Sequence, residues 1–124
     1  MKTRDRLSDI FELQQALNDD IRRKRNLEGI SHEQWIQKQT LAMLSEMAEL
    51  LDEVNFKWWK NPKPVDAGAV REELVDILHF FVSMCLEAGM TPQELYERYI
   101  SKNRENFDRQ LGRSAKPGYD AGDC

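Results

Sequence analysis

The apolar residues of this chain recur every three or four positions along most of its length, which is the period of an α-helix. No segment alternates as a half-buried strand would. Four helical segments can be traced, and they cover residues 6–26, 31–59, 66–88 and 91–111. The sequence therefore predicts an all-α fold, an antiparallel helical bundle of four main helices.

Residues at the segment ends support these boundaries. Ser31 followed by Gln34 predicts a capping box, and Thr91 followed by Pro92 predicts a helix start. Gly89 is expected to end the third helix, because glycine adopts the left-handed conformation that often follows a helix.

The length of 124 residues is that of one domain. We expect residues 1–112 to form it and residues 113–124 to be a flexible tail. A domain of this size buries only about two thirds of its unfolded surface. We therefore expect the bundle to be completed by oligomerisation, as a homodimer or a higher homo-oligomer.

Composition argues against several classes of protein. The formal net charge of −4 disfavours a nucleic-acid binder, which would carry a basic face. There is neither the apolar core of a signal peptide nor a run of about 18 apolar residues, so we expect a cytoplasmic protein without a membrane partner. Cys85 and Cys124 give no disulfide framework, and Cys85 is expected to be a buried thiol.

Two pairs of acidic residues carry the strongest chemical signal. Glu46 and Glu49 are three residues apart, as are Glu73 and Asp76, so each pair shares a helical face among apolar neighbours. The short turn at residues 61–64 makes the two helices antiparallel, so the pairs can face each other. Burying carboxylates together is unfavourable without a cation. The all-oxygen ligand set predicts a Mg²⁺ site, with Mn²⁺ as a substitute.

Two other interpretations of these acids exist. One is a solvated acidic helix with scattered ion pairs. The other is a di-iron carboxylate bundle, which needs Glu-x-x-His on two helices. Only Asp76 and His79 have that spacing here, so iron is disfavoured.

Two further groups of residues could contact a nucleotide. Trp59 could stack on a base while Lys57 and Lys60 hold phosphates. Alternatively, Trp59 could serve packing alone. Lys102, Asn106 and Arg109 share a helical face and could pair with phosphate oxygens, or they could form a solvated helix end.

Taken together, these residues resemble the all-α nucleotide pyrophosphohydrolases, which include MazG-like proteins and the dimeric dUTPases. The shared pattern is Glu-x-x-Glu, a spacer and Glu-x-x-Asp, present here at residues 46–49 and 73–76. The resemblance implies that these four acids bind magnesium.

Within that group the chain is most similar to the dimeric dUTPases, over residues 10–119. The segments that carry the likeness are residues 13–19, 56–61, 73–80, 102–110 and the closing Gly118 and Tyr119. One departure is that many dimeric dUTPases have extra helices between the second metal motif and the late basic one.

The resemblance implies a dUTP diphosphatase, which converts dUTP and water into dUMP and pyrophosphate. In this hypothesis Glu49 is the general base, and Gln14 and Asn18 read the uracil edge. The remaining contacts would come from phosphate ligands and from the lining of the base pocket: Lys57, Lys60, Lys102, Asn106 and Arg109 for phosphate, and Trp59, His79 and Phe80 for the base. The alternatives are a MazG-like enzyme with other or broader nucleotide specificity and a non-catalytic helical interaction module.

Overall fold

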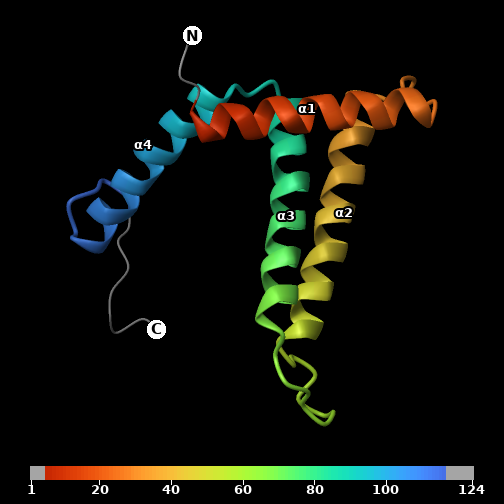
Figure 1. Ribbon diagram of the computed structural model, residues 1–124. Helices are drawn as coiled ribbons and strands as arrows, with labels where there is room; N and C mark the ends of the chain where they lie inside the picture. Colours follow the sequence, from red (N-terminus) through yellow and green to blue (C-terminus); the bar gives the residue numbers. More distant parts are fainter. Residues whose placement is uncertain (1–4, 117–124) are drawn as a thin grey trace. The chain divides into compact units, whose positions relative to one another are not determined.

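The computed structural model describes residues 5–116, and it confirms the all-α prediction (Figure 1). The helices are α1 (Arg6–Lys24), α2 (His32–Glu53), α3 (Ala67–Glu87) and α4 (Pro92–Gln110), and residues 5–116 contain no strand. In this range no single helix is long and apolar enough to cross a membrane. Only α3 and α4 taken together, with the break between them, have the length and apolar composition that a membrane span requires.

The chain divides into two compact units at the junction of Met90 and Thr91. The first unit holds α1, α2 and α3, and the second holds α4.

Every helix begins at a side-chain cap. The side chains of Asp5, Ser31, Asp66 and Thr91 each accept a hydrogen bond from a backbone N–H of the first helical turn. The capping box of Ser31 and Gln34 is present, as predicted. These bonds satisfy donors that would otherwise lack a partner at the helix start.

Helix α2 ends at Glu53, several residues before the predicted end at residue 59. Asn55 adopts a left-handed conformation with φ of 59°, and the N–H of Phe56 returns to the carbonyl of Leu51. This is the pattern of a Schellman motif, which asparagine tolerates. The Asn55 side chain also holds both the N–H and the carbonyl of Lys63, which closes the loop between α2 and α3. The sequence prediction missed this stop because it relied on proline.

Helices α2 and α3 run antiparallel side by side, and α1 crosses the pair at the end where α2 begins and α3 ends (Figure 1). Among residues 5–116, the buried residues lie on α1 and α3, and half of them are polar. They are Phe11, Gln14, Asn18, Val82, Ser83 and Cys85. The predicted burial of the Cys85 thiol is confirmed, whereas Cys124 lies outside the described residues.

Many apolar residues expected to face the core are exposed. Leu13 on α1 is 72% exposed and Leu41 on α2 is 66% exposed, and α2 has no buried residue. The physical reason is that each helix of this unit packs against few neighbours, so a broad apolar stripe is covered only in part.

The second unit consists of α4 and the residues after it. Its start matches the prediction, with Thr91 as cap and Pro92 in the first turn. Gly112, at φ of 71°, ends the helix, and the N–H of Arg113 bonds to the carbonyl of Asp108. The Ser114 hydroxyl then donates to Glu105, so the part of the expected tail that is described returns to α4.

Candidate functional site

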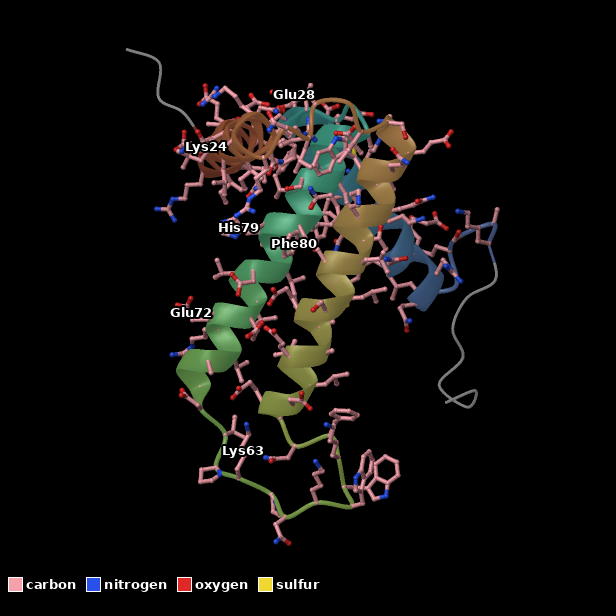
Figure 2. All side chains as sticks on the ribbon, turned by 90° about the vertical axis from the view of Figure 1, so that its right-hand side faces the viewer. Lys24, Glu28, Lys63, Glu72, His79 and Phe80 are labelled. Atoms are coloured by element: carbon pink, nitrogen blue, oxygen red, sulfur yellow. The ribbon has the colours of Figure 1, made fainter. Side chains whose placement is uncertain are left out.

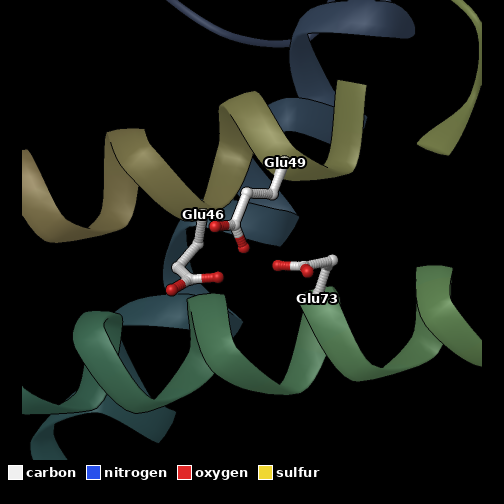
Figure 3. A group of neighbouring side chains, drawn as sticks. All are labelled: Glu46, Glu49 and Glu73. Atoms are coloured by element: carbon white, nitrogen blue, oxygen red, sulfur yellow. The ribbon is translucent and has the colours of Figure 1, made fainter. Parts of the chain in front are cut away.

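Three of the four predicted metal ligands come together between α2 and α3. Glu46, Glu49 and Glu73 each place a carboxylate oxygen so that all three lie within 4.8 Å of one another (Figure 3). Glu46 and Glu73 are half-buried and Glu49 is exposed. One oxygen of Glu46 and one of Glu73 are buried without a hydrogen-bond partner among the described residues.

Asp76 lies next to this group rather than in it. Its carboxylate is not one of the three that lie within 4.8 Å, but Asp76 lines a cavity together with Glu46. Its negative charge also contributes to the raised pKa of Glu49. Asp76 therefore lines the cavity close to the acidic group.

The carboxylates perturb one another. A hydrogen bond with Glu46, which requires one proton between the two groups, is the largest cause raising the pKa of Glu73 to about 7; burial and the charges of Glu49 and Glu46 add to it. The pKa of Glu49 is also raised, first by hydrogen bonding with Glu46 and then by the charge of Glu46. Without a cation, the fold therefore favours a proton in this group.

A cavity of about 370 Å³ adjoins the acids, and α1, α2 and α3 all line it. Four of the predicted substrate-binding residues line it: Gln14, Asn18, His79 and Phe80. The cavity thus brings the predicted base-reading residues and two of the predicted metal ligands, Glu46 and Asp76, to one hollow.

The polar groups of this cavity form a chain of hydrogen bonds. Gln14 donates from Nε2 to Oδ1 of Asn18 at 2.9 Å, and Asn18 donates from Nδ2 to the Ser83 hydroxyl at 3.1 Å. His79 places Nδ1 at 2.9 Å from the carbonyl of Val75. A carbonyl oxygen only accepts, so Nδ1 of His79 donates to it.

Several lining residues escaped the sequence analysis. Neither Arg22 nor Trp35 was among the predicted site residues. In the structure the guanidinium carbon of Arg22 lies 4.4 Å from the centroid of the Trp35 ring, and both residues line the cavity. Glu87 holds the guanidinium through a 2.9 Å ion pair. The signal was present, because Trp35, Gln39 and Glu46 fall on one helical face.

Lys57, Trp59 and Lys60 lie in the loop after α2 rather than on a helix end. This loop is at the end of the α2–α3 pair opposite α1, where Figure 2 labels Lys63. Lys57 and Lys60 line a separate cavity of about 260 Å³, and Trp59 packs edge-on against Trp58 at 4.7 Å. The structure does not bring these residues to the 370 Å³ cavity, and their role in binding stays a prediction.

Lys102, Asn106 and Arg109 all lie on α4, in the second unit. Lys102 lines a hollow of that unit, and Asn106 is exposed. Gly118 and Tyr119 lie outside the described residues. Phosphate binding by α4 stays a prediction.

Comparison with known proteins identifies similar phage proteins and a matching family. The dCTP pyrophosphatase of Enterobacteria phage T4 is 32% identical over 87 residues, covering 59% of this chain and 51% of the phage protein. The dCTP pyrophosphatase of Enterobacteria phage LZ5 is 31% identical over 74 residues, covering 60% of this chain and 43% of that protein. The chain thus spans about half the length of the curated relatives it matches. No solved structure matches.

A family model described as dUTPase matches residues 6–94, which include α1, α2, α3 and both acidic pairs. Because this match covers well over half of the 124 residues, the chain belongs to the dUTPase family.

Proposed function

We propose that this protein is a magnesium-dependent nucleotide pyrophosphohydrolase that acts on a pyrimidine deoxynucleoside triphosphate, with dUTP as the preferred substrate. The observation that carries the proposal is the 370 Å³ cavity, which has the amides of Gln14 and Asn18 among its lining residues and also the acids Glu46 and Asp76. Amides can match the donors and acceptors of a pyrimidine edge.

The acidic group fits a hard divalent cation. Its three carboxylate oxygens lie within 4.8 Å of one another, and the unpartnered oxygens of Glu46 and Glu73 are candidates for ligation. Mg²⁺ prefers such oxygen ligands, and Mn²⁺ accepts them. When bound, the ion would polarise phosphoryl oxygens and offset negative charge.

Glu49 would act as the general base. It is the exposed member of the acidic group, so water can reach its carboxylate. In the proposed reaction Glu49 takes a proton from water while the water oxygen bonds to the α-phosphorus. The bond from that phosphorus to the bridging oxygen breaks, which releases pyrophosphate and leaves the nucleoside monophosphate.

A second candidate substrate is dCTP, favoured because the two phage relatives are dCTP pyrophosphatases. A MazG-like enzyme of broader specificity is the wider alternative. The experiment is a panel of dUTP, dCTP, dTTP, dATP and dGTP, with pyrophosphate release measured with and without Mg²⁺. We expect Mg²⁺-dependent release with dUTP fastest. Release from all five at similar rates would favour the broader enzyme, and no release from any would contradict the proposal and favour a non-catalytic helical module.

A further inference from the structure

Ser83 is buried next to the two amides of the cavity, although nothing in the proposed reaction uses it directly. It lies on α3, is 3% exposed and lines the cavity. Its hydroxyl oxygen lies 2.8 Å from the carbonyl oxygen of His79 and 3.4 Å from Oδ1 of Asn18. A hydroxyl has one proton, so the shorter contact, to His79, takes it.

The hydrogen bond from Ser83 to the His79 carbonyl fixes the orientation of the Asn18 amide. With its proton on the His79 carbonyl, the Ser83 oxygen can only accept, and Asn18 must turn Nδ2 toward it. Oδ1 of Asn18 then faces Gln14, which must donate from Nε2. Reversing either amide would place two donors or two acceptors together in a region where Gln14 and Asn18 are 7% and 8% exposed. Such mismatches between buried polar groups are costly.

The order of these bonds decides what Gln14 offers a ligand. Its Nε2 is engaged with Asn18, and among the described residues its Oε1 accepts no hydrogen bond. Because Gln14 lines the cavity, it can offer a ligand its carbonyl oxygen in a fixed place, beside the remaining N–H of the same amide. Uracil presents a donor at ring N3 and an acceptor at O4. Cytosine presents an acceptor at N3 and a donor at N4, which is the reverse order. An amide free to turn could serve both bases, whereas a fixed amide serves one.

We propose that Ser83 is a specificity-determining positioning residue. Anchored on the His79 carbonyl, it fixes the amide orientation of Asn18 and, through it, that of Gln14, so that the site distinguishes uracil from cytosine. This inference rests on the proposed function, because it concerns base choice in the same cavity.

The test compares the ratio of kcat/KM for dUTP and dCTP in the full-length wild type and in Ser83→Ala. We expect the ratio to move toward one by about fivefold to tenfold, the worth of one net hydrogen bond, because both amides are then free to turn. Ser83→Thr keeps the hydroxyl and should restore the wild-type ratio. If Ser83→Ala does not fold, Ser83→Cys, whose thiol is a weak donor, takes its place.

Thr40→Ala is the matched control. Thr40 also donates from its hydroxyl to the carbonyl four residues earlier, at 2.7 Å, but it does not line the cavity. It should leave the ratio unchanged. A general loss of helix stability would affect both variants and both nucleotides alike, and so would not move the ratio.

An unchanged ratio in a folded Ser83→Ala protein overturns the proposal, and so does a wild type that does not distinguish the two nucleotides. A wild type that cleaves neither contradicts the proposed function instead. In that case NMR of the side-chain amides still decides. Slow exchange of the Gln14 and Asn18 amide protons that becomes fast in Ser83→Ala supports the fixed orientation, and equal exchange in both proteins overturns it.

Discussion

Glu46 on α2 and Glu73 on α3 point their carboxylates into the same space between the helices, and each keeps one buried oxygen without a hydrogen-bond partner among the described residues (Figure 3). Carboxylates this close repel each other when both groups are ionised. A cation or a proton relieves that repulsion.

Replacing Glu49 by Gln should lower kcat by about a hundredfold or more, because a positioned general base contributes at least that much. The measurement is Mg²⁺-dependent pyrophosphate release from dUTP. Glu72→Gln is the matched control, because Glu72 is an exposed neighbour on α3 outside the acidic group. Wild-type activity of Glu49→Gln at saturating Mg²⁺ would rule out Glu49 as the base.

Stability without divalent cations should fall as the pH rises from about 4.5 to about 7. The pKa of Glu73 in the fold is about 7, above its ordinary 4.5, so the folded protein keeps a proton that the unfolded chain has already released. The contribution of Glu73 is complete below its unfolded pKa and is lost as the pH passes about 7. Urea denaturation in EDTA measures this, and Glu73→Gln should flatten the dependence.

Mg²⁺ should raise the thermal midpoint more at about pH 8 than at about pH 5.5, because protons compete with the ion for the same oxygens. At a hundredfold excess over the dissociation constant, binding to the folded state alone stabilises by about 2.7 kcal/mol. Differential scanning fluorimetry with and without EDTA measures the shift. We expect Glu46→Gln to lose most of it and Glu72→Gln to keep it; a full shift in Glu46→Gln would contradict ligation by Glu46.

Glu87→Gln should destabilise the protein by about 1–3 kcal/mol, the cost of leaving a partly buried polar group without its partner. Glu87 accepts from Arg22 at 2.9 Å through one oxygen and lies 3.1 Å from Nδ1 of His32 through the other. It thereby ties α1 and the start of α2 to the end of α3. Chemical denaturation measures the change. Asp20→Asn, which breaks only exposed ion pairs within α1, is the control and should have no measurable effect.

The sequence was sufficient for the helices and for the shared face of Glu46 and Glu49, because both depend on local spacing. Thr91 with Pro92, and the three-residue interval from Glu46 to Glu49, express their geometry within one or two helical turns. The end of α2 was missed because Asn55 stops the helix partly through bonds to Lys63, eight residues later.

Other features of the cavity depend on contacts between helices, which spacing within one helix does not reveal. Arg22 acquires its place from Trp35 and Glu87, which lie on two other helices. Gln14 and Asn18 could be selected by resemblance, but the Ser83 bond that orients them joins residues 65 positions apart. Asp76 was expected within the acidic group, and only the relative placement of the helices showed it beside that group.

The exposed leucines affect how the thermal stability of this protein should be measured. Leu13, Leu41 and Leu44 are each more than half exposed, and only Phe11, Val82 and Cys85 are both apolar and buried among the described residues. If a second copy covers those leucines, as we expect, folding and self-association become one equilibrium. The melting temperature would then rise with protein concentration, and a value quoted without that concentration would not characterise the chain.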